Sequence, residues 1–376
     1  MPRVLLIGSA ETKGRELAAL SAALTAHGLT VDPVDLSLGS GGAVLSGTAK
    51  LAAMTDRAAA ASAAAGARAG ACVAAVGLGG GTGSEMALAV LRALPATLPK
   101  LLVTTLASDP RAPLADCGVI LIPTLCDIEG THPMLARVFE TTAAMVAGLT
   151  RARAVAESQR PAVAVSSLGA TGVAATAIAR GLTRQGAEPV LFHANGYGGA
   201  AMARFLRDGH GAGAIDLTVH ELGRMHIAGA CAPMPDRFTA GGALPRVVLP
   251  GGLNILGLGA LDTLSPAHRA RPHYAHTAGF THVVLTEAEM AALAAALAEA
   301  LNGSTGPAHV LIPMGGFSHE DRPGGAIEAP RLRAIAAETL EGAARVFTVE
   351  RLPHHINAPE TARAAVAALL QRMQDA

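Results

Sequence analysis

Side chains that could transfer protons gather in the second half of the chain. His193 ends an apolar run, His220 and Glu221 follow "IDLTV", and Asp236 lies in "MPDRF". Histidine and carboxylate side chains suit general acid–base catalysis, because a nearby carboxylate raises the pKa of an imidazole toward working pH. We therefore expect catalytic residues at these four positions.

The same residue types could hold a divalent metal, since histidine and carboxylate suit zinc or manganese. No two histidines have HExxH spacing, and the metal ligands are left open. His273 and His276 have i, i+3 spacing, but Pro272 favours a loop there over a helix. We count Mg²⁺ or another divalent ion among the expected cofactors without assigning its ligands.

A glycine-rich stretch, "GLGGGTGSEM", lies between an apolar run and a segment with helical spacing. A glycine loop before a helix offers free N–H groups and the positive end of the helix dipole to an anion. Gly80, Gly81, Thr82 and Gly83 are therefore candidate ligand-binding residues. Tight packing of strand against helix is the alternative explanation, and the stretch is not a Walker A loop because no GxxxxGK[ST] occurs.

Other loops add candidates for binding an anion. "SAETKGREL" places Thr12 and Lys13 after the first apolar run, where the lysine could balance negative charge. "VVLPGGLNIL" places Gly252 and Asn254 after a later one.

"HANGYGGAAM" offers backbone donors at Gly196, Gly198 and Gly199. The spacing of Gly196, Gly198 and Ala201 also permits a dinucleotide fingerprint, with Asp216 as the ribose acid. An NAD-type oxidoreductase is thus one alternative function.

These loops require elements that place them together. Apolar runs of four to six residues, starting with Val4–Ile7, alternate with helical segments, which indicates parallel sheets buried on both faces. The plan restarts near residue 155, so we predict two Rossmann-like α/β domains, 1–155 and 156–376, joined through 150–160. In open parallel sheets ligands lie outside the carboxyl ends of the strands. We expect the loops to border a cleft between the two domains.

Composition restricts the partners. The chain has 376 residues, 29 Lys plus Arg, 29 Asp plus Glu and no Trp, so neither a basic surface nor base-stacking platforms for nucleic acid are expected. No apolar run has the roughly 20 residues of a membrane span. The four cysteines lack CxxC spacing, which favours a reduced, cytoplasmic protein. An alanine-rich, charge-neutral α/β chain is expected to form a homo-oligomer.

Taken in order, several motifs resemble the UPF0261 family, the Tm-1-like ATP-binding domain proteins. The resemblance covers essentially the whole chain and is carried by "ETKGREL", "GLGGGTGSEMALAVLRAL", "FHANGYGGAAMARFLRDG", "IDLTVHEL", "MPDRF", "VVLPGGLNIL" and "LIPMGGFSHEDRPGG". It implies two α/β domains and ATP, or a similar phosphate-bearing ligand, between them.

The chain departs from the family pattern at several positions. Asn254 stands where the family has an aspartate, Val284 where it has an arginine, and Val219–His220 where it has threonines. Two alternatives are therefore left open: an anion other than ATP as the ligand, and His220 as a new catalytic group. We expect a hydrolase or group-transfer enzyme acting on a phosphate- or carboxylate-bearing ligand. A nucleotide-binding regulatory module without catalysis is the alternative.

Overall fold

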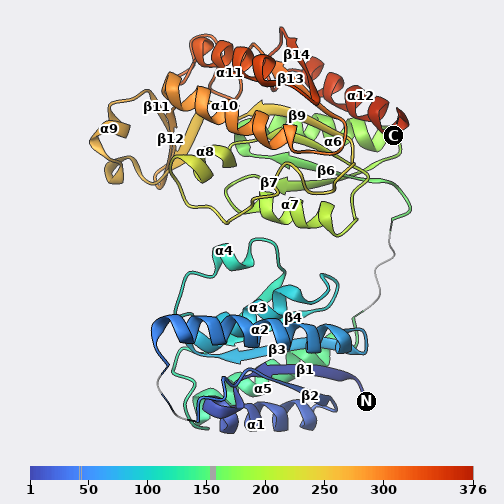
Figure 1. The fold of residues 1–376 in the computed structure, drawn as a ribbon, viewed down its shortest axis with the longest axis vertical. Coiled ribbons are helices and arrows are strands. Elements are labelled where there is room, and N and C mark those ends of the chain that lie inside the picture. The colour runs from blue at the N-terminus through green and yellow to red at the C-terminus, as the bar shows by residue number, and fades with distance from the viewer. Residues whose placement is uncertain (42, 44, 153–157, 376) are drawn as a thin grey trace. The chain divides into compact units, whose positions relative to one another are not determined.

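The computed structural model describes residues 1–41, 43, 45–152 and 158–375. The chain divides into two compact units, Met1–Ala156 (unit 1) and Glu157–Ala376 (unit 2), which Figure 1 draws in blue to green and in green to red. Both are α/β with parallel main sheets, which confirms the predicted fold class. Residues 153–157 of the expected linker, and with them the expected domain boundary, lie outside the described residues.

Unit 1 is built from alternating strands and helices. In chain order they are β1 (Arg3–Gly8), α1 (Ala10–Ala26), β2 (Thr30–Asp35), α2 (Gly47–Ala69), β3 (Cys72–Gly79), α3 (Gly81–Ala93), β4 (Lys100–Thr104), α4 (Arg111–Leu114), β5 (Val119–Pro123) and α5 (Pro133–Leu149). The strands form one parallel sheet in the order β2-β1-β3-β4-β5.

The continuous apolar run of β1 is explained by helices on both faces of this sheet. Val4 and Leu6 pack in a core with side chains of α1 and α5, whereas Leu5 and Ile7 pack in a second core with side chains of α2 and α3. Successive side chains of a strand point to opposite faces, so a strand covered on both sides must be apolar at every position. The predicted first strand, Val4–Ile7, is confirmed.

Unit 2 repeats this alternation and adds to it. Its elements are β6 (Ala162–Ser167), η1 (Gly169–Thr171), α6 (Gly172–Arg184), β7 (Glu188–His193), α7 (Gly198–Arg207), β8 (Gly213–Thr218), α8 (Glu221–His226), β9 (Arg246–Gly251), β10 (Ile255–Leu258), η2 (Leu261–Thr263), α9 (Pro266–Arg269), β11 (His273–Thr277), β12 (Phe280–Val284), α10 (Glu287–Asn302), β13 (Ala308–Pro313), α11 (Pro330–Ala343), β14 (Phe347–Leu352) and α12 (Pro359–Asp375).

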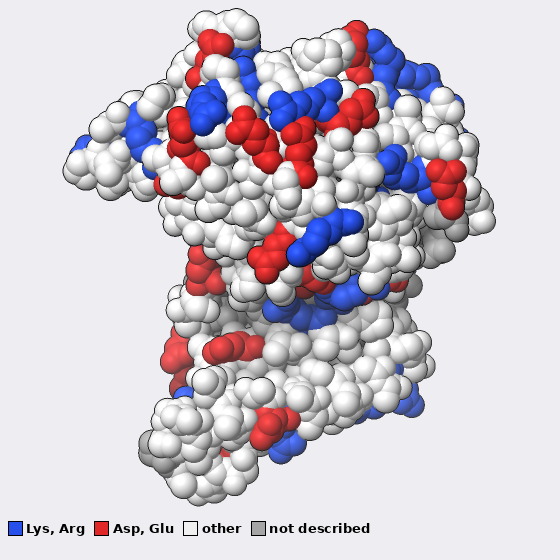
Figure 2. Space-filling model, turned by 45° about the horizontal axis from the view of Figure 1, so that its top comes forward, with Lys and Arg blue, Asp and Glu red and all other residues white. Residues whose placement is uncertain are grey.

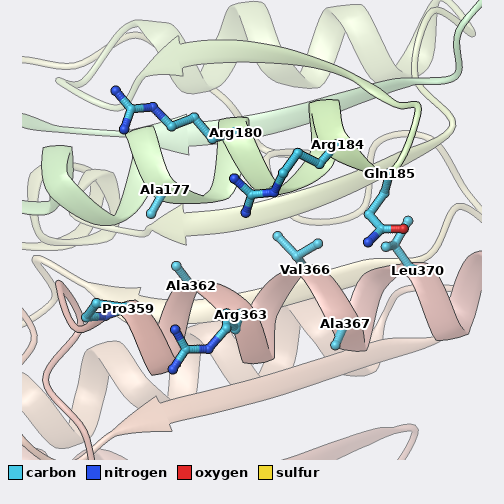
Figure 3. Close-up of a pocket in the computed structure, with 11 residues that line it drawn as sticks. Ala177, Arg180, Arg184, Gln185, Pro359, Ala362, Arg363, Val366, Ala367 and Leu370 are labelled. Carbon is cyan, nitrogen blue, oxygen red and sulfur yellow. The ribbon is translucent and has the colours of Figure 1, made fainter.

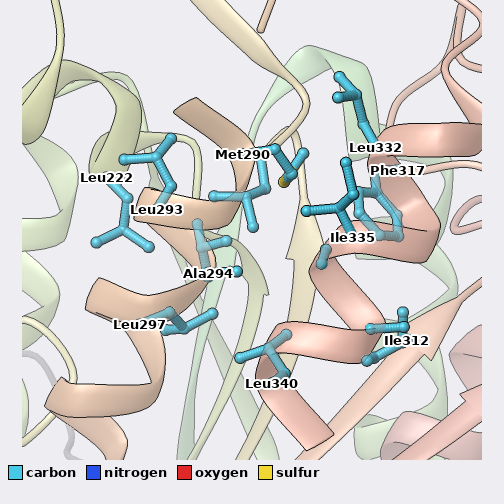
Figure 4. Close-up of a cluster of buried hydrophobic side chains, with 14 of the residues drawn as sticks. Leu222, Met290, Leu293, Ala294, Leu297, Ile312, Phe317, Leu332, Ile335 and Leu340 are labelled. Carbon is cyan, nitrogen blue, oxygen red and sulfur yellow. The ribbon is translucent and has the colours of Figure 1, made fainter. Parts of the chain in front are cut away.

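The main sheet of unit 2 has six strands in the order β14-β13-β9-β8-β6-β7, and all its pairs are parallel. One face is covered by α6 and α12, which share a core with β6, β8 and β9. On the other face α10 and α11 pack side by side over β9 and β13. Figure 4 shows Met290 and Leu297 of α10 facing Ile335 and Leu340 of α11, with Leu293 beside Leu222. Each fully buried leucine or isoleucine contributes roughly 1.5–3 kcal/mol to folding.

A separate antiparallel sheet, β10-β12-β11, is inserted between β9 and β13. The loop predicted around His273 and His276 is wrong, because both residues lie in strand β11. Pro272 precedes this strand, and β11 lies at the edge of its sheet, where a preceding proline costs no ladder hydrogen bond.

The surface agrees with the balanced composition. Figure 2 shows basic and acidic side chains interspersed over the face in view. The four cysteines are free and partly exposed. Within the described part of the chain, no helix combines the length and the apolar character that crossing a bilayer requires.

Candidate functional site

The carboxyl edge of the main sheet in unit 2 carries two adjoining cavities. One of about 400 Å³ and one of about 250 Å³ share Gly169, Ala170, His276 and His282. We call them together the hairpin pocket, because the β11–β12 hairpin forms one wall. Its lining residues come from six parts of unit 2: Leu168, Gly169, Ala170, His193, Asn195, Arg224, Tyr274, His276, Thr277, Phe280, His282, Ser318, His319, Glu320 and Ile327.

The topology explains why a pocket forms here. Strand β6 lies between β7 and β8, so the chain leaves β6 toward β7 on one side and later continues from β8 on the other. The loops that follow β6 and β8 therefore diverge, and such a switch point opens a crevice at the carboxyl edge. Leu168, Gly169 and Ala170 of the first loop line the cavity, and the helix after β8 supplies Arg224.

The hairpin contributes an aromatic wall. Tyr274 and His276 on β11, with Phe280 and His282 on β12, project from the same face of the small sheet, because side chains alternate along each strand. The rings of His276 and His282 stack with centroids 5.5 Å apart, and those of Phe280 and His282 lie 5.2 Å apart. Burial, assisted by the charges of His276 and Arg224, lowers the pKa of His282 to about 4. Its imidazole is therefore neutral at pH 7.

His220 lies behind this wall and is 1% exposed. Its Nδ1 donates to the carbonyl oxygen of Gly252 at 3.1 Å, and its Nε2 accepts from Nε of Arg224 at 3.4 Å. Burial, with Arg224 as the second cause, lowers the pKa of His220 to about 3. The predicted catalytic residue His220 is thus a buried, neutral imidazole that accepts a hydrogen bond from Arg224.

Arg224 brings a positive charge into the pocket. Its Nη1 donates to the carbonyl oxygen of Ala230 at 3.0 Å, and its guanidinium lies 5.5 Å from the ring centre of Phe280. Among the ion pairs found over residues 1–41, 43, 45–152 and 158–375, none includes Arg224. An arginine stays protonated in proteins, so Arg224 carries a full positive charge, and the carboxylate of Glu221 that acts on it through space is already hydrogen-bonded to Gly196, Gly199 and Arg237.

Gly257 makes room for this arrangement. It lies opposite His282 on β10, and a Cβ there would be 2.7 Å from Nη2 of Arg224, Nε2 of His220 and Cζ of Phe280. A side chain at this position would displace at least one of the three groups.

Gly169 and Ala170, which line both cavities, lie at the N-terminal end of a helix. They open the short helix η1, which continues into the 13-residue helix α6. The first N–H groups of a helix have no helical acceptor and carry the positive end of the dipole. This helix end and Arg224 therefore favour the same sign of ligand charge.

The loop after β13 carries His319 and Glu320. Its shape is fixed by the buried Asp321, which accepts from the N–H groups of Phe317 and Ala329 at 2.8 Å each and pairs with Arg333. Glu320 is 16% exposed, with His319 Nδ1 at 2.9 Å and Arg322 Nη2 at 3.6 Å from its oxygens. A carboxylate is thus held at the cavity wall beside Ser318 and Ile327.

The predicted catalytic Glu221 occupies a different environment. It is fully buried, its Oε1 accepts from the N–H groups of Gly196 and Gly199 at 3.1 and 2.9 Å, and its Oε2 accepts from Nε of Arg237 at 3.0 Å. A Cβ at Gly199 would overlap Glu221 and Arg237. The glycine loop does bind an anion, but that anion is the protein's own carboxylate.

Arg237 extends this network to Asp216. The two Asp216 oxygens each accept from an arginine at 2.5 Å, one from Arg237 and one from Arg246. Burial opposes the charge on Asp216, but the two arginines outweigh it and lower the pKa of the carboxyl. Because both oxygens have cationic partners inside the protein, Asp216 does not offer a carboxylate to a ribose.

The remaining predicted residues of unit 2 are dispersed. His193 is exposed and lines the hairpin pocket at the end of β7, as expected from its position after an apolar run. A Cβ at Gly198 would overlap its carbonyl oxygen. Asp236 pairs with Arg207 and is absent from the residues that line the hairpin pocket.

Gly252 and Asn254 follow β9 and are buried beneath the pocket. Gly252 has a φ of +66° and supplies the carbonyl oxygen that His220 contacts. Asn254 donates to Oγ of Ser318 at 3.4 Å, while its Oδ1 has no hydrogen-bond partner among the described residues. Both residues support the floor of the site.

In unit 1 the predicted binding residues lie at the corresponding edge. Lys13 pairs with Glu129 at 2.9 Å, and Thr12 is exposed. The hydroxyl of Thr82 accepts from Nζ of Lys50 at 3.4 Å. A Cβ at Gly80 or Gly83 would meet open space, and one at Gly81 only Ala107 at 3.5 Å. These glycines leave their backbone accessible.

Over the described residues, no group of three or more His, Cys, Asp and Glu side chains has a geometry that could hold a metal ion. A larger cavity of about 550 Å³ lies between α6 and α12, away from the carboxyl edge (Figure 3). Arg180, Arg184 and Arg363 border it together with apolar residues of α6 and α12. It offers no acid–base group, so we place the candidate site in the hairpin pocket.

Sequence reasoning did not select Arg224 and Glu320 as site residues, and it missed Phe280 and His282. The signal for Phe280 and His282 was a hairpin pattern, "HYAHTAGFTHVV", in which an Ala-Gly turn separates two β-prone runs. It also passed over Gly169 and Ala170, although "SSLGATG" holds the same place in the second half as "IGSAETKG" in the first.

Comparisons with known proteins cover nearly the whole chain. The N-terminal domain model of the uncharacterised protein family UPF0261 matches residues 43–155, and its C-terminal domain model matches 160–373. UPF0261 proteins of Mesorhizobium japonicum and Rhizobium meliloti are each 32% identical to this chain over 98% of its length. The matched regions cover 99% and 98% of those two proteins. The ToMV resistance protein Tm-1 of Solanum lycopersicum is 29% identical over 79% of this chain and 41% of its own length.

Proposed function

We propose, for a chain that belongs to the UPF0261 family, that unit 2 binds a small anionic molecule in the hairpin pocket and acts on it by acid–base chemistry. The observation that carries the proposal is Arg224, a largely enclosed cation at the pocket wall that no described carboxylate neutralises. A phosphate or carboxylate group is the counter-charge that such a cation recognises.

The surroundings of Arg224 support binding of an anion over structural use of the charge. His220 contacts it as a neutral imidazole, and Gly169 and Ala170 at the N-terminal end of η1 line the same cavity. The buried carboxylate of Glu221 acts on Arg224 only through space, because its oxygens already accept hydrogen bonds from Gly196, Gly199 and Arg237. Hydrogen bonds between charged partners stabilise a complex by about 1.5–3 kcal/mol each.

Acid–base chemistry is assigned to the exposed histidines that line the pocket. His193 and His276 both reach the cavity from its rim, and histidine is the side chain that most often transfers protons in enzymes. Hydrolysis or group transfer at a carbonyl or phosphoryl centre is the reaction class we propose. In this scheme Glu221 is a positioning residue, because it anchors the start of α8, the helix that carries Arg224.

A binding module without catalysis is the second candidate. The relative Tm-1 is named a resistance protein, and that name describes no reaction. An NAD-type oxidoreductase loses its support, because Asp216 is neutralised by two arginines. ATP, a divalent metal, a ligand position between the units, a cytoplasmic location and a homo-oligomer stay predictions.

The test is calorimetric titration of the full chain with inorganic phosphate and with acetate. We expect saturable binding, weakened about tenfold or more by Arg224→Gln because one charge-assisted contact is lost. Arg180→Gln, at an exposed arginine of the same unit, is the matched control and should leave the affinity unchanged. Equal affinity in the Arg224 variant and the wild type would refute the assignment of the site.

Catalysis is tested separately once an anion that the protein converts is found. His193→Gln and His276→Gln should then lower kcat while leaving anion binding nearly intact. Binding without conversion across a broad set of phosphate and carboxylate esters would favour the binding module.

A further inference from the structure

We propose that the hairpin pocket has two chemically opposite ends and takes a small monocarboxylate whose other end carries a hydroxyl or amino group. The inference rests on the proposed function and names the ligand class for the same site. It comes from the placement of Arg224 in one cavity and Glu320 in the adjoining one.

The first end binds the carboxylate. Arg224 is the cation of the larger cavity, and its fork of N–H donors matches the two oxygens of a carboxylate. His220 and Ala230 hold the guanidinium through Nε and Nη1, and Phe280 packs against it. Because these contacts fix its position, the guanidinium loses little freedom on binding.

The second end accepts hydrogen bonds. Glu320 lines the smaller cavity, and its neighbours His319 and Arg322 have side chains that are 62% and 53% exposed. Ion pairs with exposed partners are weak and screened by solvent, so they do not saturate the carboxylate. An ionised carboxylate accepts about four hydrogen bonds, which leaves oxygen sites for the hydroxyl or ammonium group of a ligand.

None of the described residues that border both cavities contributes a buried side chain with a full charge. Gly169, Ala170, His276 and His282 border both cavities, and burial keeps His282 neutral at pH 7. A dicarboxylate would place its second anion near Glu320. Like charges that are close together repel more strongly near a protein surface than in bulk water. A triphosphate would bring several negative charges to the pocket, where Arg224 is the one arginine among the described lining residues.

The experiment compares matched ligands by calorimetric titration of the full chain at pH 7. The four-carbon set is butyrate, 4-hydroxybutyrate, 4-aminobutyrate and succinate, and the three-carbon set is propionate, 3-hydroxypropionate, β-alanine and malonate. In at least one set we expect the hydroxy or amino acid to bind about tenfold more tightly than the plain acid, as one charge-assisted hydrogen bond provides. The dicarboxylate should bind least tightly.

Two variants separate the ends. Glu320→Gln should retain affinity for the plain acid, remove most of the preference for the amino acid and improve binding of the dicarboxylate. Glu287→Gln, an exposed carboxylate that pairs with Arg331, should change none of these. Circular dichroism of each variant verifies that it is folded.

The failure of this inference is distinct from failure of the proposed function. If plain acids or phosphate bind through Arg224 but the hydroxy and amino acids gain nothing, the two-ended pocket is refuted and the anion site remains. The same holds if Glu320→Gln leaves the ligand preference unchanged. If Arg224→Gln has no effect on any anion, both proposals fail.

Discussion

Units 1 and 2 share a sheet topology and differ in the segments that lie at the carboxyl edge of the sheet. Numbered within each unit, the strand order is 2-1-3-4-5 in unit 1 and 2-1-3-4-5-6 in unit 2. Both therefore have a switch point between their first and third strands. Unit 2 adds the β10-β12-β11 sheet after its fourth strand and a 16-residue stretch between β13 and α11. Those additions supply most of the residues that line the hairpin pocket. The shared sheet therefore sets the position of the candidate site, and the inserted segments supply most of its side chains.

The glycine-rich loops show the same contrast. In unit 1, Gly80 and Gly83 border open space, whereas a Cβ at Gly79 would lie 2.5 Å from the backbone nitrogen of Ser84. In unit 2, Gly196 and Gly199 give their N–H groups to Glu221. The glycine loop of unit 1 borders open space, whereas the glycine loop of unit 2 uses its N–H donors in hydrogen bonds within the protein. Glycine content alone does not distinguish a ligand loop from a packing loop.

The cations differ in a comparable way. Lys13 of unit 1 has Glu129 at 2.9 Å, while the ion pairs found in the described part of the chain leave Arg224 of unit 2 without a carboxylate. Glu129 is exposed and offsets the charge of Lys13 only in part. An enclosed arginine without a counter-ion attracts anions strongly. The comparison supports the proposal that unit 2 holds the stronger anion site.

The largest expected effect concerns the buried carboxylate. Glu221→Gln should destabilise unit 2 by about 3–5 kcal/mol, because it removes one charge from a buried ion-pair network. Hydrogen exchange of the full chain, followed by mass spectrometry of peptides, localises the loss. Glu129→Gln, at the exposed pair of unit 1, should cost no more than about 1 kcal/mol. Equal effects in the two units would contradict the distinction.

The second effect concerns anion affinity. Arg224→Gln should weaken phosphate binding about 10- to 100-fold, as loss of a charge-assisted contact of about 1.5–3 kcal/mol requires. Lys13→Gln should change it less than twofold if unit 2 holds the stronger site. Titration calorimetry on both variants measures the two changes. A larger loss in the Lys13 variant would move the primary site to unit 1.

The third effect separates the two glycine loops. Gly199→Ala should cost about 1–3 kcal/mol, since the added methyl must displace Glu221 or Arg237. Gly83→Ala lies inside α3 with open space around it, and alanine should stabilise that helix by about 0.5–1 kcal/mol. Denaturant unfolding of both variants gives the comparison. A stabilised Gly199 variant would show that this loop is not packed against the network.

The smallest effect depends on pH. Burial depresses the pKa of His282 to about 4 and of His220 to about 3, both below the ordinary 6.5. Their unfolded forms bind protons first as pH falls, so the stability of unit 2 is complete above pH 6.5 and declines below it. Each histidine contributes a slope of about 1.4 kcal/mol per pH unit between its two pKa values.

Unfolding at pH 7.5 and 5.5 measures this decline, and His282→Gln should make it shallower. His226→Gln, at an exposed histidine of the same unit, should leave it unchanged. A slope that His282→Gln does not alter would show that His282 gains no proton on unfolding in this range.

Much of the fold was readable from residue patterns. Continuous apolar runs such as that of β1 predicted buried parallel strands, and their alternation with helical segments predicted two α/β units. The carboxyl edge followed as the place for ligands, and His193 lies there. The hairpin was missed at His273–His276, because Pro272 was weighed as a loop signal when it precedes an edge strand.

Roles within the site were less readable, because they depend on partners that are distant in the sequence. Glu221 and Arg224 are three residues apart, and the sequence analysis selected Glu221 as catalytic because of its residue type and passed over Arg224. Tertiary packing neutralises Glu221 with Arg237 and leaves Arg224 at the pocket wall beside residues of the hairpin.

The sequence by itself determined the strands, the helices and the edge at which polar residues collect, because hydrophobic periodicity acts over a few neighbouring residues. Only the tertiary structure decided which charges are cancelled and which face a ligand. The reason is electrostatic: burial makes an unpaired charge costly, and whether a charge is paired depends on groups that folding brings from elsewhere in the chain.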